Sequence, residues 1–167
     1  MKKRTVYLIA ALAASSSMTP ISSEAAGTSL RAKFSFDGLA TCQQPAITNF
    51  PIHGEGTGEL STDRTAKLDM NSNVEGQVRL NAKLGGKPME APGGSASLRV
   101  SGRHTLRAVR DYPNNTIIIN MTVVGNSCSM TLENRLKPGK RQYTFYNGSG
   151  LSYCSKPQIT RTSCEGY

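Results

Sequence analysis

The chain has 167 residues, a formal net charge of +9 at pH 7 and no tryptophan. Its length argues against several domains and favours one domain that is large enough to bury a core. Its charge favours polyanionic neighbours, which include anionic lipid, acidic polysaccharide, nucleic acid and acidic proteins, but it does not choose among them.

The N-terminal segment is typical of a secretory signal peptide. Basic residues at positions 2–4 precede an uncharged run over 5–14, and small residues surround a cleavage site within 23–26. The apolar run is shorter than the roughly 20 residues that span a bilayer. We predict that residues 1–25 are removed and that residues 26–167 form a single β domain with a charge of +7. The protein is expected to be exported, periplasmic or extracellular, without a transmembrane segment after cleavage.

Period-two alternation of apolar and polar residues dominates the rest of the chain, and such alternation is typical of half-buried β-strands. Between Val74 and Leu84, for example, the apolar positions would circle the whole surface of a helix, which argues against an amphipathic helix. The stretches predicted to form strands are residues 30–37, 65–70, 74–84, 98–108, 116–124, 128–133 and 142–146.

Turn signals separate these strands. A proline within residues 112–115 suits a type I turn, and Pro138 followed by Gly139 suits a type II turn. Residues 50–54 indicate a loop by composition, and the alternate glycines over 54–58 indicate bends. The pattern predicts an all-β fold, either an antiparallel β-sandwich or a small closed β-barrel of about eight or nine strands, with the sandwich favoured.

The four cysteines, Cys42, Cys128, Cys154 and Cys164, all lie in the predicted mature chain. An even number in an exported chain predicts two disulfides that stabilise the fold. Because a short loop closes most readily, we expect Cys154–Cys164, with Cys42–Cys128 as the second bridge. The sequence has no C-x-x-C motif, and neither histidine stands at ligand spacing from a cysteine, so no metal site and no cofactor is expected.

Arginines recur along one predicted strand region. On one continuous strand, Arg99, Arg103 and Arg107 would share a face, and guanidinium groups in such a row can bind phosphate or carboxylate groups. Gly102 is expected to interrupt that strand, and Arg110 falls on its other face. The alternative interpretation is a solvated outer face, which is common in antiparallel sheets.

A second basic group, which includes Arg135, surrounds the predicted turn at residues 137–140. If the sheet brought both groups together, they would form a surface for an anionic lipid, a polysaccharide or an acidic protein. Charged hairpin tips are also common without such a role. The candidate anion-binding residues are Arg99, Arg103, Arg107, Lys137, Lys140 and Arg141.

The residue inventory favours a binding or structural module over an enzyme. His53 lies in the predicted loop, and His104 falls on the apolar side of its predicted strand, where a structural role is expected. A hydrolase would need one of these histidines in an open cleft beside a carboxylate or hydroxyl. Nucleic acid is a disfavoured partner, because the aromatic residues of the C-terminal third lie far in sequence from the arginines.

A carrier of an apolar ligand is another alternative. It would require a barrel whose inward-facing rows leave a cavity. The natural lining candidates are Leu80, Leu84, Ile119 and Met121, which would serve equally well as core residues.

The segment Ser149-Gly150-Leu151-Ser152-Tyr153 resembles the S-G-x-x-Y motif of bacterial periplasmic inhibitors of c-type lysozyme, which are small disulfide-bonded β-barrels. The resemblance covers three fixed positions in five residues. It implies an inhibitor in which Ser149 and Tyr153 lie near a loop that enters the cleft of the enzyme. A domain with a charge of +7 would, however, be repelled by a basic lysozyme during encounter.

Overall fold

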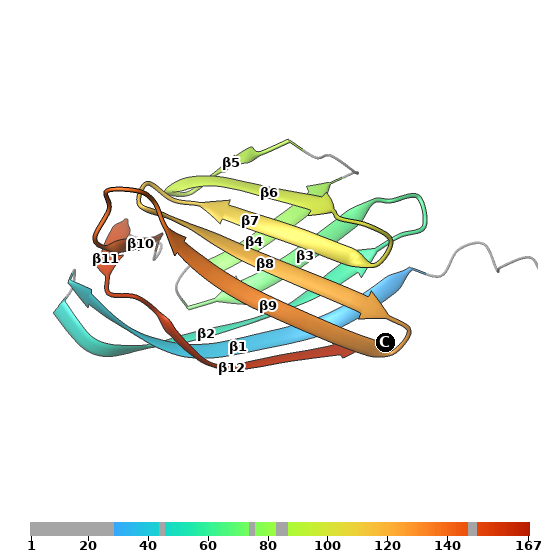
Figure 1. The fold of residues 1–167 in the computed structure, drawn as a ribbon, viewed down its shortest axis with the longest axis horizontal. Coiled ribbons are helices and arrows are strands. Elements are labelled where there is room, and N and C mark those ends of the chain that lie inside the picture. Colours follow the sequence, from blue (N-terminus) through green and yellow to red (C-terminus); the bar gives the residue numbers. More distant parts are fainter. Residues whose placement is uncertain (1–28, 44–45, 74–75, 83–86, 147–149) are drawn as a thin grey trace, which may run out of the picture.

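The chain folds into β-strands that are joined by turns (Figure 1). The computed structural model describes residues 29–43, 46–73, 76–82, 87–146 and 150–167. The expected all-β class is confirmed, but this part of the chain forms twelve strands rather than eight or nine. No helix within these ranges is long and apolar enough to cross a lipid bilayer. The predicted signal peptide, residues 1–25, lies outside the described residues.

Seven strands form the larger sheet, in which β10, β11, β1, β2, β3 and β4 follow one another and β12 pairs with β1. β1 is long enough to hold two partners along one edge, because β12 pairs with residues 32–39 and β11 pairs with Cys42. All pairs are antiparallel. The strands are β1 (Leu30–Gln43), β2 (Ala46–Leu60), β3 (Ala66–Ser72), β4 (Gly76–Ala82), β10 (Tyr143–Tyr146), β11 (Leu151–Cys154) and β12 (Gln158–Gly166).

The smaller sheet contains five antiparallel strands in the order of the chain. They are β5 (Met89–Ala91), β6 (Gly94–Val100), β7 (Thr105–Asp111), β8 (Asn115–Val124) and β9 (Ser127–Leu136). The turn after β9 has the expected chemistry, since Gly139 has a φ of 76° and the Lys140 N–H donates to the Lys137 carbonyl at 3.1 Å.

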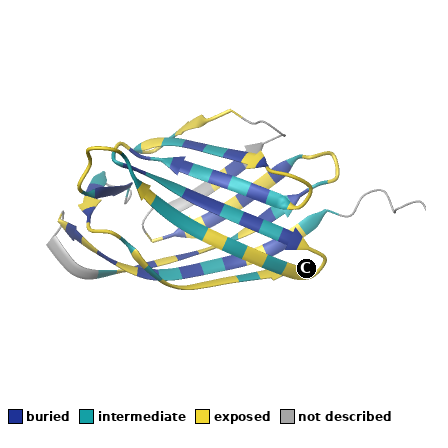
Figure 2. Ribbon diagram, in the orientation of Figure 1, coloured by how far each residue is buried: buried dark blue, intermediate teal, exposed yellow. Residues whose placement is uncertain are grey.

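The inward faces of the two sheets pack against each other and share one core (Figure 1). On β1, Phe34 and Phe36 are buried while Lys33 is exposed, which is the alternation that the sequence predicts. Figure 2 shows the same alternation of buried and more exposed residues along β6, β7 and β8. Neither sheet closes on itself, so the structure does not support the closed-barrel alternative.

The predicted loop over residues 50–54 is instead part of β2. Two of the three glycines that suggested bends face aromatic rings of β1, because Gly54 pairs with Phe36 and Gly56 pairs with Phe34. A Cβ atom on Gly54 would lie 2.2 Å from Cζ of Phe36. Gly54 and Gly56 therefore make room for aromatic rings over the strand, an arrangement known to compensate for glycine in sheets.

Pro51 is tolerated in β2 because β3 does not reach it. The pairing of β2 with β3 begins at Gly54, so β2 behaves as an edge strand at Pro51. The side chain of Asn73 takes the place of the missing strand: its Nδ2 donates to the Pro51 carbonyl at 2.7 Å, and its Oδ1 accepts from the His53 N–H at 2.8 Å.

The predicted disulfide pairing is wrong. The bridges are Cys42–Cys154 and Cys128–Cys164. Cys154 pairs with Cys42 of β1, whereas Cys164 pairs with Phe34 of the same strand. These two positions on β1 are eight residues apart, roughly 26 Å along a strand, whereas a disulfide needs Cα atoms within roughly 7 Å. Proximity in sequence therefore does not predict which cysteines pair. Cys128–Cys164 joins the two sheets, because β9 and β12 belong to different sheets.

A buried polar contact attaches β10 to the smaller sheet. Asn115 is fully buried, and its Oδ1 accepts from the backbone N–H of Thr144 at 2.7 Å and from the Thr144 hydroxyl at 2.9 Å. Its Nδ2 donates to Asn134 on β9 at 2.9 Å. This contact fixes β10 so that Phe145 faces the interior, where its ring lies edge-on to Tyr112 with centroids 6.3 Å apart.

Candidate functional site

A cavity of about 340 Å³ lies between the two sheets. This volume falls near the lower end of the range for small-molecule sites, roughly 300–1,000 Å³. Ala108 of β7 contributes to the space, because its small side chain stands between Leu98 of β6 and Ile119 of β8. The apolar residues of the wall include Phe36, Ile52, Leu68, Met70, Leu80, Ile117, Ile119 and Phe145.

The cavity reaches the surface at the edge where β9 and β12 diverge. In Figure 1 these two strands lie close together near the C-terminus and separate toward the left. Cys128–Cys164 joins them at the close end. At the other end, residues 132–135 of β9, residues 156 and 157 before β12 and Ile159 within β12 line the cavity. Arg135 and Lys156 are the exposed residues of this lining, so the mouth lies between these two segments.

The order of the strands defines the depth of the cavity. Inward from the mouth, the smaller sheet presents β9, β8 and β7, and the larger sheet presents β12, β1, β2, β3 and β4. Ala108 on β7 and Leu80 on β4 therefore lie at the deep end, opposite the mouth.

One cationic side chain belongs to the deep wall. Arg110 is 7% exposed and is the only charged residue that is buried within the described part of the chain. Its guanidinium group donates to the carbonyls of Pro92 and Ser95 and lies 4.5 Å from the ring centroid of Tyr112. Carbonyl dipoles and an aromatic face both stabilise a cation that has been removed from water.

The candidate arginines of the first basic group occupy the β6–β7 hairpin. Gly102, with a φ of 81°, interrupts the run as expected. Arg99 and Arg107 then stand directly opposite each other on the outer face of the smaller sheet, while Arg103 lies in the turn beyond them. The Arg107 guanidinium donates to Asn120 Oδ1 at 3.0 Å.

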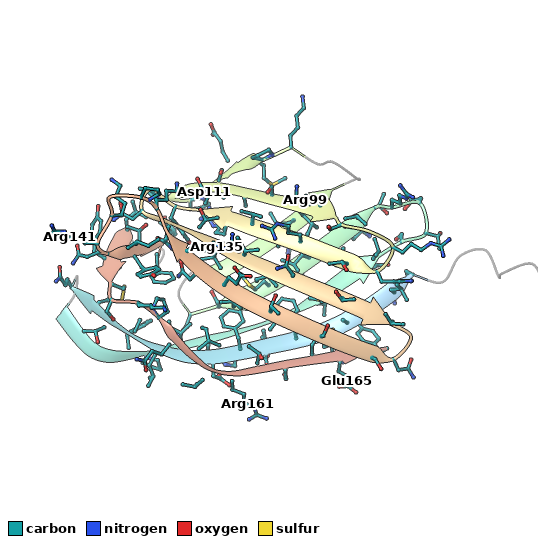
Figure 3. All side chains as sticks on the ribbon, in the orientation of Figure 1. Arg99, Asp111, Arg135, Arg141, Arg161 and Glu165 are labelled. Carbon is teal, nitrogen blue, oxygen red and sulfur yellow. A yellow bond between two sulfur atoms is a disulfide. The ribbon has the colours of Figure 1, made fainter. Side chains whose placement is uncertain are left out.

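The second basic group lies at the other end of this sheet. Lys137 donates to Asp111 Oδ2 at 2.9 Å, and Asp111 is four residues, roughly 13 Å, beyond Arg107 along β7. Lys140 and Arg141 are exposed in the connection from β9 to β10. Figure 3 shows Arg141 far from Arg99. The structure therefore does not bring the two predicted groups together into one surface.

At this end of the sheet, the surroundings of Asp111 shift the pKa of its carboxyl group. Partial burial alone would raise the pKa of its carboxyl group. Hydrogen bonds from the Thr116 hydroxyl and from Lys137, together with the charge of Lys137, outweigh burial and hold the pKa of Asp111 below its ordinary value of 3.8.

The two histidines do not lie in an open cleft. The His53 Nδ1 lies 2.7 Å from Asp37 Oδ1 on the outer face of the larger sheet, where the His53 side chain is 56% exposed. His104 is exposed in the β6–β7 turn and does not lie on an apolar strand face, because the strand ends before Gly102 and the alternation does not continue through the turn. The described residues contain no group of three metal-ligating side chains.

Two of the four proposed cavity-lining residues, Leu80 and Ile119, line the cavity. Met121 is buried but is not part of the wall, and Leu84 lies outside the described residues. No pattern in the sequence marks the mouth residue Lys156, because the segment between β11 and β12 has no apolar alternation.

The motif that resembles lysozyme inhibitors lies at the start of β11. Ser149 lies outside the described residues, and Tyr153 is an exposed residue of β11. Comparison of the chain with protein-family models, with curated proteins and with solved structures gives no match.

Proposed function

We propose that this protein is an exported binding module that holds a small apolar molecule between its two sheets. The observation that carries the proposal is the cavity of about 340 Å³, which has largely apolar walls and reaches the surface at one edge. Two disulfides are typical of an oxidising compartment outside the cytoplasm, and they support export.

The walls predict how affinity depends on the ligand. Each methylene group that moves from water into an apolar site contributes about 0.8 kcal/mol. Affinity for a series of linear ligands should therefore increase with each added carbon until the cavity is full, and then stop increasing. A surface patch without a cavity would not give such a limit.

The first test is native mass spectrometry of the protein after gentle release from its own compartment. A bound apolar molecule that survives in the gas phase supports the proposal and identifies the chemistry of the ligand. Titration with the neutral fluorescent probe N-phenyl-1-naphthylamine then measures the dissociation constant. Protein that carries no ligand and binds no probe would overturn the proposal.

A cavity-filling variant connects binding to this site. Ala108→Leu adds three carbons at the deep end, and we expect it to weaken probe binding by about tenfold or more. Thr131→Leu is the matched control, because it adds apolar volume at an exposed position of β9 outside the cavity. Equal affinities of the Ala108→Leu protein and the unmodified protein would show that the probe binds elsewhere.

A second candidate function rests on the pairing of Arg99 with Arg107. Like charges directly opposite each other on neighbouring strands are destabilising. An anionic partner on this outer face, such as lipid or acidic polysaccharide, would relieve that repulsion. Arg103 in the adjacent turn would extend the same surface.

Retention on anionic vesicles or polysaccharide tests this second candidate. Replacing Arg99, Arg103 and Arg107 together with serine should abolish salt-sensitive retention. The matched control replaces Arg31, Arg79 and Arg161 with serine, since these lie on the other sheet and remove the same charge. Equal loss in both triple variants would show that total charge, not this face, causes retention.

A further inference from the structure

The mouth of the cavity carries an excess of positive charge. Lys156 lines it opposite residues 132–135 of β9. Glu133 and Arg135 alternate with the inward-facing Leu132, so their side chains lie on the outer face of this edge strand. The Arg135 Nε donates to Glu133 Oε2 at 2.8 Å, so these two charges compensate each other. Lys156 is exposed and forms no ion pair with any described residue. A ligand group that rests at the mouth therefore meets an uncompensated ammonium group.

The inner walls reinforce this bias toward anions. Among the residues that line the cavity, Glu133 at the mouth is the only carboxylate, whereas the deep wall contains the buried cation Arg110. In an interior of low polarity, charges interact more strongly than in water. The cavity therefore disfavours a cationic ligand group and favours an anionic one.

The geometry of the edge defines the shape of the ligand. Cys128–Cys164 joins β9 and β12 outside the cavity wall, and the cavity extends from the mouth to β7 and β4. Its volume is at the lower end of the range for ligand sites, so it suits one hydrocarbon chain rather than two.

We infer that the ligand is a single-chain amphiphile with a carboxylate head, such as a fatty acid. The hydrocarbon chain lies between the sheets, and the carboxylate lies at the mouth beside Lys156. This inference rests on the proposed function, because it assigns the ligand of the same cavity. It adds a prediction that the cavity alone does not make, namely a preference for an anionic head over a neutral one.

The test compares two ligands that have the same chain. Dodecanoate and dodecanol differ only in the head group, and at about pH 8 the carboxyl group is ionised. Displacement of N-phenyl-1-naphthylamine from the oxidised protein measures both affinities. We expect dodecanoate to bind about tenfold more tightly than dodecanol, which corresponds to one charge-assisted contact.

A single variant tests the assigned residue. Lys156→Met should reduce the preference for dodecanoate to less than about twofold and leave dodecanol binding unchanged. Lys67→Met is the matched control, because it removes the charge of an exposed lysine on β3 that does not line the cavity. The control should keep the full preference.

The possible outcomes separate the two proposals. Equal affinity for both ligands would overturn the inference about the head group while the apolar cavity remains functional. A preference that survives in the Lys156→Met protein would overturn the assignment of the head group to the mouth. Failure of both ligands to displace the probe would contradict the proposed function itself.

Discussion

The Asp111 carboxylate connects three segments at one end of the smaller sheet. It accepts hydrogen bonds from the Thr116 hydroxyl at 2.6 Å and from Lys137 at 2.9 Å. Because the pKa of Asp111 is lower in the folded protein, its contribution to stability is present above the unfolded pKa near 4. It is lost as the pH falls through the folded pKa, so the effect disappears in the acid range below about pH 4.

Urea unfolding of Asp111→Asn at pH 7 and near pH 2.5 measures this contribution. Both partners are more than one third exposed, so solvent screens the pair and we expect a loss of only about 0.5–1 kcal/mol at pH 7. The difference from the unmodified protein should vanish near pH 2.5. A difference that is equal at both values of pH would show that shape, not charge, explains the effect. Lys137→Met provides the second arm of a double-mutant cycle.

The alternating glycines of β2 define how this strand packs against β1. Gly54→Ala would place a methyl group against the Phe36 ring, and we expect destabilisation of about 1–3 kcal/mol from the resulting overpacking. Phe36→Leu removes the far end of the ring. Its combination with Gly54→Ala should therefore cost clearly less than the sum of the two single changes in urea unfolding. Strict additivity would contradict the close approach of Phe36 to Gly54.

The same strand shows where sequence patterns are sufficient and where they are not. Alternation along β1, β7 and β8 is a local property, and it predicts those strands because each has one buried face. β2 has glycines in place of large apolar residues on its buried face, so it has no such alternation. Its burial depends on Phe34 and Phe36, which belong to another strand. A pattern within β2 alone cannot supply that information.

The disulfide pairing and the cavity depend on contacts between distant parts of the chain. Cys128 and Cys164 meet because β9, at the edge of the smaller sheet, contacts β12, at the edge of the larger sheet. The cavity mouth likewise combines β9 with the segment after β11. The residue types of the cavity wall are those of any apolar core, so the sequence alone does not distinguish Leu80 as a wall residue from Leu80 as a packed one.

The two disulfides are expected to differ in what they support. Loop-closure entropy assigns about 5 kcal/mol to Cys42–Cys154, with a separation of 112 residues, and about 4 kcal/mol to Cys128–Cys164, with a separation of 36. Cys42–Cys154 lies within the larger sheet, whereas Cys128–Cys164 holds the two sheets together at the edge that contains the mouth. Loss of Cys128–Cys164 should therefore widen that edge and lower the affinity for an apolar ligand.

Paired serine substitutions separate these roles. Cys42→Ser with Cys154→Ser should cause the larger loss of stability in urea, yet retain affinity for N-phenyl-1-naphthylamine in the absence of denaturant. Cys128→Ser with Cys164→Ser should lose less stability but bind the probe several-fold more weakly, since β9 and β12 are then held only by packing. If affinity instead falls in proportion to stability in both variants, the bridge between the sheets has no specific role in shaping the cavity.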